Sequence, residues 1–285
     1  MTWALFAFLS AFSLATADAL SKRALKSTDD LVIVWVREGY ALPFLAVAFL
    51  FVPVPALDPT FWVTVATLIP LEILALILYV KAIRLSPLSL SVPFMAFTPA
   101  FIMFIAFVIL GETPDASGFS GIVLIALGAY LLNIGAFKQG VLGPIKAIGK
   151  EPGSVLMLIV ALIYSVTATL GKVAVGHSSP FFFGFFYPFL LTVMLSGILI
   201  AKGRLRGVAA KPFVFLPIGL CAAVMILSHF IAISLADVAY MIAIKRTSLL
   251  FSVLYGRLFF GEEAVGERLL GAGVMLAGVV LITAF

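Results

Sequence analysis

The stretch "TPAFIMFIAFVILGE" (residues 98–112) combines a proline, an apolar run and a Gly-Glu pair at its end. Extended back to residue 87, the run is long enough for a helix to cross a hydrocarbon core of about 30 Å. Similar runs recur along the 285 residues, of which 64% are hydrophobic and 11% charged. Soluble domains carry about 25% charged residues. The sequence therefore predicts an all-α integral membrane protein.

Ten transmembrane helices are predicted, and the polar connectors between them are too short for a soluble domain. The motif "ATADA" (15–19) has the form of a signal-cleavage site, but no basic region precedes the first run, so we expect that run to remain as a mature helix. The single cysteine, Cys221, excludes an intrachain disulfide. The predicted spans are 2–20, 31–52, 60–82, 87–110, 118–137, 154–175, 179–201, 212–235, 238–260 and 264–284.

The net charge of +5 comes mainly from the connectors of one side. Lys and Arg follow the first, third, fifth and seventh spans, whereas "VPVPALDP" (52–59), "GETPDASG" (111–118), "GHSSP" (176–180) and "LAD" (235–237) contain none. Such a bias is a topology signal, because basic loops stay in the cytoplasm. It predicts a multi-pass protein of the cell (inner) membrane with both termini outside, surrounded by the lipid bilayer and without a nucleic-acid partner.

A shift of 150 residues aligns the chain with itself without gaps. The shift places "VILGE" (108–112) on "LFFGE" (258–262) and "SK" (21–22) on "GK" (171–172), and it places Gly121 and Gly128 on Gly271 and Gly278. A repeat of five spans, an odd number, must be inverted in the membrane, which is typical of carriers that work by alternating access. We expect two five-helix repeats, 1–137 and 154–285, joined by a cytoplasmic linker at 138–153.

These features resemble the drug/metabolite transporter (DMT) superfamily, in particular its EamA-type ten-helix members. The residues that carry the resemblance are the proline, apolar run and Gly-Glu of 98–112 and the glycine-rich "SGIVLIALGAYLL" (120–132) that follows. In the second half, "KRTS" (245–248) resembles the triose-phosphate (sugar-phosphate) translocator branch. That resemblance implies that the Lys-Arg pair and Lys172, late in the sixth span, clamp a phosphate.

Several ionisable residues lie within the predicted spans, where each needs a partner, a cavity or a substrate. Three cations and an imidazole in the outer third of the second half favour an anionic ligand, because Arg offers a planar fork and Lys a compact charge. Tyr164 shares a helix face with Lys172 and is predicted to line the cavity. Lys172 could instead extend its ammonium to the interface, and His229 could be a packing residue. The predicted substrate-binding set is Lys172, Lys245, Arg246, His229 and Tyr164.

Glu72 is predicted to lie near the membrane midplane, about 18 Å into its helix at 1.5 Å per residue. It is either a proton or cation site or the ion-pair partner of Arg37 or Arg246. We expect Glu72 and Arg37 to act in coupling or in support of the binding residues. Pro87, Pro93 and Pro99 predict a kinked fourth helix, which could act as a gate or only serve packing.

The sequence thus predicts a secondary active transporter of a small polar, anionic metabolite, phosphorylated or carboxylated, that works by alternating access. A proton or a counter-substrate would drive it, since the chain has no P-loop, and no cofactor or metal is predicted. One alternative is an exporter of amino acids or cationic drugs that uses Glu72. Another is an intramembrane enzyme acting on a lipid-linked substrate, for which the chain lacks HExxH and paired acidic motifs.

Overall fold

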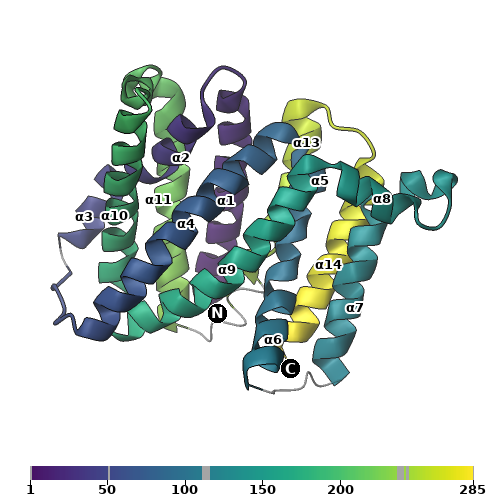
Figure 1. Ribbon diagram of the computed structural model, residues 1–285, viewed down its shortest axis with the longest axis horizontal. Coiled ribbons are helices and arrows are strands. Elements are labelled where there is room, and N and C mark those ends of the chain that lie inside the picture. Colours follow the sequence, from purple (N-terminus) through teal and green to yellow (C-terminus); the bar gives the residue numbers. More distant parts are fainter. Residues whose placement is uncertain (1, 51, 111–115, 236–240, 242–243, 285) are drawn as a thin grey trace.

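The computed structural model describes residues 2–50, 52–110, 116–235, 241 and 244–284, and these residues contain helices but no strand (Figure 1). Six of the helices are long and apolar enough to cross a membrane. They are α1 (Thr2–Leu25), α4 (Pro59–Leu85), α9 (Pro152–Gly176), α10 (Pro180–Ala201), α11 (Pro212–Leu235) and α14 (Val265–Ala284). The prediction of an all-helical membrane protein is confirmed at this level.

The second predicted span is not one helix. Residues 31–52 contain α2 (Asp30–Gly39) and α3 (Leu42–Phe49), which are separated at Tyr40. Pro43 lies in the first turn of α3, where its missing amide hydrogen does no harm. A continuous helix would have required that hydrogen for a bond to the preceding turn. The expectation of one uninterrupted span here was wrong.

The fourth predicted span, 87–110, is also interrupted. It consists of α5 (Leu88–Ser91), the 3-10 helix η1 (Val92–Ala96) and α6 (Phe97–Leu110). The interruption contains Pro93, which has no amide hydrogen to donate. Nearby hydroxyls satisfy neighbouring carbonyls, because Ser91 donates to the Pro87 oxygen at 2.9 Å and Thr98 donates to the Met95 oxygen at 2.9 Å. The predicted kink is therefore present as a short tightened turn.

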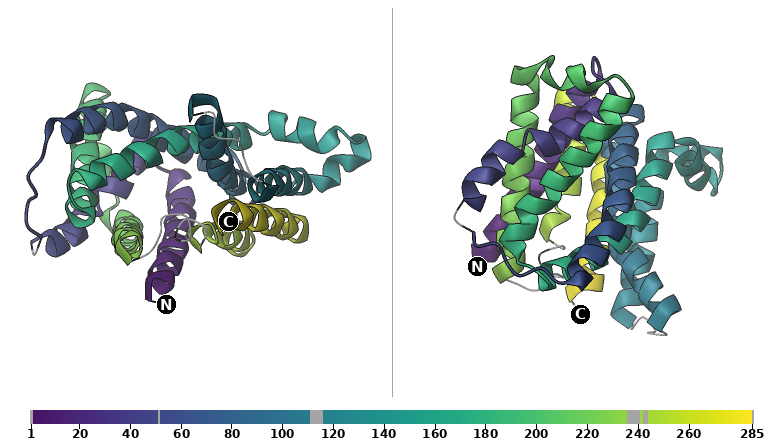
Figure 2. Two further views of the ribbon diagram at one scale, coloured as in Figure 1. Left: turned by 90° about the horizontal axis from the view of Figure 1, so that it is seen from below. Right: turned by 60° about the vertical axis from the view of Figure 1, so that its left-hand side comes forward.

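Shorter helices complete the described part of the chain. α7 (Ala116–Leu131) leads into the 3-10 helix η2 (Ile134–Gln139) and α8 (Gly143–Lys150), which project from the side of the molecule (Figure 2). The 3-10 helix η3 (Leu205–Ala209) follows α10, and α13 (Ser248–Phe260) precedes α14. Residues 138–153, predicted as a linker, are thus largely helical.

The 150-residue shift converts one pair of neighbouring helices into another. α1 lies beside α11 and α4 lies beside α9, and the register carries α1 onto α9 and α4 onto α11. α7 lies antiparallel to α14, with Gly121 against Gly278 and Gly128 against Gly271. A Cβ on Gly128 would lie 2.6 Å from the Gly271 carbonyl oxygen, so only glycine permits this close approach.

The basic connectors meet at one end of the molecule, drawn at the top of Figure 1. Arg84, at the end of α4, forms an ion pair with Asp30 at the start of α2. Arg204, after α10, places its Nη1 2.5 Å from Asp29 Oδ2. We call this end the basic end.

The opposite connectors that the structure describes also lie together. His177, after α9, places Nδ1 2.6 Å from Asp58 Oδ2, before α4. The Phe61 amide donates to Asp58, and this hydrogen bond to the ionised form lowers the pKa of Asp58. Residues 111–115 of "GETPDASG" and 236–237 of "LAD" lie outside the described residues. The connectors that the structure describes therefore sort into two ends, as their charges predict.

Candidate functional site

The candidate site begins where the chain stops being helical just before α13. Ile244 and Lys245 are helical, but Arg246 and Thr247 form a turn. The Thr247 hydroxyl donates to the Ile244 oxygen at 2.7 Å, and the Leu249 amide donates to the Arg246 oxygen at 3.0 Å. No proline lies in this turn, in contrast to the counterpart in the first half.

The turn at Arg246–Thr247 lies at the place that the 150-residue register gives to the end of η1. The register carries η1 (Val92–Ala96) onto residues 242–246, and η1 lies beside α13. Interrupted helices that face each other at the centre of two related halves are the usual setting of a transporter binding site, because they leave backbone and side-chain polar groups available to a ligand. Lys245 and Arg246 are partly buried at this turn.

The cationic side chains at this turn have few partners. Lys245 Nζ lies 3.2 Å from His229 Nδ1 of α11. An ammonium group can only donate, so His229 accepts through Nδ1 and carries its proton on Nε2. The Nε atom of Arg246 is buried and has no hydrogen-bond partner among the residues described. Within the same residues, neither cation forms an ion pair with a carboxylate.

An acidic group shares this interior. Glu72 of α4 lies next to the hydroxyls of Thr167 and Tyr187 and within electrostatic range of Lys245. The Tyr187 hydroxyl is buried and makes no hydrogen bond of ordinary geometry to any described residue. Tyr164 is partly buried and lies within electrostatic range of Glu72. The structure thus places Lys245, Arg246, His229, Tyr164 and Glu72 in one region, and it adds Thr167 and Tyr187 from α9 and α10.

Arg37 has a different partner from the one considered in the sequence. Its Nη1 lies 2.7 Å from Asp18 Oδ1 and 3.3 Å from the Ser21 hydroxyl. Tyr79 donates to Asp18 Oδ2 at 2.5 Å, and the guanidinium carbon lies 5.4 Å from the centre of the Tyr79 ring. The suggestion that Glu72 pairs with Arg37 is therefore wrong, because Asp18 already neutralises this guanidinium.

Asp18 is the charged residue that the sequence reasoning missed. It lies in the "ATADA" motif, which was considered only as a cleavage site. The available signal was simpler, since a carboxylate inside an apolar run needs a partner in the membrane. Its side chain is 1% exposed and that of Arg37 is 7% exposed, so the pair is fully enclosed by α1, α2 and α4.

The structure does not place Lys172 with Lys245, Arg246 and His229. It is exposed on α9, four residues before the helix ends, and no ion pair of Lys172 occurs among the described residues. The three-residue phosphate clamp of the translocator branch is thus not assembled in this structure. Over the same part of the chain, no group of three His, Cys, Asp or Glu residues is placed to hold a metal ion.

Comparison with known proteins gives a consistent family. The model of the EamA-like transporter family matches residues 1–134 and again residues 151–284, so the two matches begin 150 residues apart (151 − 1). No curated protein matches the chain. A solved structure described as "Crystal structure of protein" has a TM-score of 0.61 and 14% identity, and the match covers 99% of this chain and 96% of that chain. At that identity the likeness concerns the fold alone. Because the family matches cover nearly all of the sequence, this chain belongs to the EamA-like transporter family.

Proposed function

We propose that this protein is a secondary active transporter of the DMT superfamily that moves a small polar metabolite with a phosphate or carboxylate group. Two inverted five-helix halves would alternate between states open to either side, driven by a proton or a counter-substrate. Support comes from the family membership, the two family matches 150 residues apart and the exchanged helix pairs. The protein would lie in the cell membrane with its basic end in the cytoplasm and both termini outside.

One observation supports an anionic substrate most directly. Arg246 and Lys245 lie together at an interrupted helix, and neither has a carboxylate at ion-pair distance among the described residues. A buried charge without a partner is costly, and an anionic ligand offsets that cost. The buried Nε of Arg246 has no hydrogen-bond partner among the described residues, so a phosphate or carboxylate can accept from the guanidinium fork.

Each neighbouring residue has a role in this proposal. Lys245 adds a compact positive charge that follows the ligand, and His229 orients Lys245 through the 3.2 Å contact. Tyr164 contributes a hydroxyl to the wall of the site. Lys172 has no place in this group, because its side chain is exposed on α9.

A second candidate substrate class follows from Glu72. Its carboxylate lies beside the hydroxyls of Thr167 and Tyr187, and no described cation is at ion-pair distance. Such a carboxylate can accept a proton for coupling, or it can bind an ammonium group. In the latter case the protein exports amino acids or cationic drugs, with Glu72 as the main ligand.

Uptake and exchange in proteoliposomes test both candidates against phosphorylated, carboxylated, zwitterionic and cationic solutes. Loss of a charge-assisted hydrogen bond is worth about 1.5–3 kcal/mol, so Arg246→Gln should lower kcat/KM for the anionic substrate about 10- to 100-fold. Arg257→Gln is the matched control, because Arg257 lies exposed on α13. If Arg246→Gln transports anions like the wild type, the proposed anion site is wrong. Selective loss of ammonium substrates in Glu72→Gln would establish the second candidate instead.

A further inference from the structure

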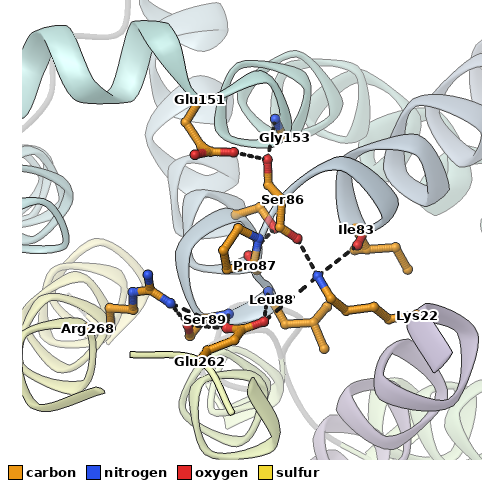
Figure 3. A network of polar contacts seen from close by, with 11 residues as sticks. Lys22, Ile83, Ser86, Pro87, Leu88, Ser89, Glu151, Gly153, Glu262 and Arg268 are labelled. Atoms are coloured by element: carbon orange, nitrogen blue, oxygen red, sulfur yellow. Dashed lines mark hydrogen bonds and ion pairs between the residues drawn. The ribbon is translucent and has the colours of Figure 1, made fainter. Parts of the chain in front are cut away.

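The Gly-Glu pair of the second half lies at the basic end, in a network of polar contacts (Figure 3). Glu262, in the connection between α13 and α14, accepts hydrogen bonds from the amides of Leu88 at 2.8 Å and Ser89 at 3.0 Å. The Ser89 hydroxyl also donates to Glu262. These amides open α5, and the residue before them, Pro87, has no side-chain oxygen to cap them. Glu262 therefore caps a helix of the other half, 174 residues away along the chain.

Two cations complete the contact. Lys22 at the end of α1 donates to the Ile83 oxygen at 3.1 Å and to the Ser86 oxygen at 2.5 Å, and its Nζ lies 3.8 Å from Glu262 Oε1. Arg268 of α14 lies 3.4 Å from Glu262 Oε2 and donates to the Ser89 hydroxyl. Figure 3 shows Lys22 and Arg268 on either side of the Glu262 carboxylate.

The same cluster reaches α9. The Ser86 hydroxyl donates to Glu151, just before α9, and accepts from the Gly153 amide at 2.8 Å. A Cβ on Gly153 would lie 2.4 Å from Ser86 Oγ, so the start of α9 packs directly against the end of α4. The network thus joins α1, α4, α5, α9 and α14 at one end of the molecule.

The Glu262 carboxylate is largely enclosed by its neighbours. The side chains of Glu262, Lys22 and Arg268 are only 7%, 15% and 13% exposed. Gly256 of α13 leaves the room that Glu262 occupies, because a Cβ there would lie 2.4 Å from Glu262 Oε2. Charge-assisted hydrogen bonds sheltered from water are stronger than exposed ones.

We propose that Glu262, Lys22, Arg268 and Ser89 form a latch that holds the basic end closed and must release for the carrier to open there. The proposal rests on the alternating access proposed above. The latch joins the two predicted halves, because Lys22 and Ser89 belong to the first and Glu262 and Arg268 to the second. Moving the α13–α14 connection away from α5 and the end of α1 at this end therefore breaks the bonds that Glu262 and Arg268 make to Leu88, Ser89 and Lys22.

The 150-residue register places a second lysine, Lys172, at the position equivalent to Lys22. The register carries Lys22 onto Lys172, which is exposed and forms no ion pair among the described residues. Glu112, the counterpart of Glu262, lies outside those residues. Among the described residues, Lys22 is therefore bonded across the basic end, whereas Lys172 is exposed near the end of α9.

Labelling of a single introduced cysteine tests the latch without any substrate. Ser91 lies at the end of α5, the helix that Glu262 caps, and is 0% exposed, so Ser91→Cys in a Cys221→Ser background reports opening. A membrane-impermeant maleimide is applied to reconstituted protein from the basic side and, separately, from the opposite side. Replacing the Glu262 charge removes at least one charge-assisted bond, so Glu262→Gln should raise labelling from the basic side about tenfold or more.

Two further variants provide an independent perturbation and a control. Gly256→Ala, which displaces the carboxylate sterically, should raise basic-side labelling in the same direction. Glu263→Gln is the matched control, because Glu263 is the exposed neighbour, and it should leave the rate unchanged. Unfolded protein would react from both sides, whereas latch release exposes the introduced thiol from the basic side alone. Unchanged labelling in Glu262→Gln overturns the latch, and it does so whether or not the transport panel identifies a substrate.

Discussion

Replacing Asp18 by Asn should strongly destabilise the protein, because it leaves Arg37 buried without a counter-charge. The two groups lie 2.7 Å apart, with side chains 7% exposed for Arg37 and 1% exposed for Asp18. Tyr79 donates to the same carboxylate at 2.5 Å, so Asp18 is held by an arginine and a phenol at once. Asn keeps an acceptor of nearly the same size, and the perturbation is therefore chiefly the loss of one negative charge.

The magnitude follows from the contact distance. Two unit charges with centres about 4 Å apart interact by about 4 kcal/mol at an effective dielectric constant near 20. The Asn oxygen still accepts from Arg37, and such a bond retains about 1 kcal/mol. The net loss is about 3 kcal/mol, at the lower end of the 3–5 kcal/mol that breaking a buried ion pair typically costs.

Reversible unfolding in mixed micelles measures this loss. Asp30→Asn is the matched control, because its ion pair with Arg84 joins side chains 26% and 42% exposed and should contribute about 1 kcal/mol or less. Combining Asp18→Asn with Arg37→Met removes the stranded charge and should recover part of the stability. A loss below about 1 kcal/mol for Asp18→Asn, or a double variant less stable than the sum of the single variants, would refute the reasoning.

Three further outcomes are expected. Gly128→Ala should destabilise the protein by about 1–3 kcal/mol in the same unfolding assay, because the added methyl group would lie 2.6 Å from a carbonyl oxygen of α14. Gly197→Ala, with no atom within 4 Å of the new methyl group, should be neutral or slightly stabilising. The lowered pKa of Asp58 means that its ionised form stabilises the folded state above about pH 4. The stability difference between wild type and Asp58→Asn should therefore shrink as the pH falls below that value, as thermal unfolding across pH 3–7 would show. Lys172→Gln should change the KM for the transported anion less than Lys245→Gln does, because only Lys245 lies at the interrupted helix. An equal effect of the two in proteoliposomes would return Lys172 to the binding site.

The membrane class and the interior charges could be predicted from the sequence. Hydropathy is a local property, so apolar runs indicate helices wherever they occur. An ionisable residue within such a run must be enclosed, which singled out Lys245, Arg246, Glu72 and His229 before any packing was known. The glycines at 121, 128, 271 and 278 were recognised in the register, and they are the positions at which α7 and α14 touch.

The sequence predicted the breaks within transmembrane helices less well. Proline marks some breaks and is absent from others. Proline indicated the break at Val92–Ala96, but the break after Lys245 contains none. The predicted span 31–52 divides at Tyr40, directly after Arg37, Glu38 and Gly39 and shortly before Pro43, and the prediction of one span did not use these signals. Continuity of a transmembrane helix depends on neighbouring hydroxyls and packed helices that replace the lost backbone bonds, and these come from distant parts of the chain.

The sequence by itself determined that this protein is a helical membrane transporter with charges that have to be buried. Only the tertiary structure decided which groups meet: the Asp18 carboxylate meets Arg37, and the Glu262 carboxylate meets the amides of Leu88 and Ser89. Among the described residues, Lys172 meets none of the interior charges. Hydropathy places a residue along a helix, but the rotation and tilt of that helix set its partners. Close packing of side chains against other helices sets that rotation and tilt, because in lipid the helices associate through shape and hydrogen bonding and not through hydropathy.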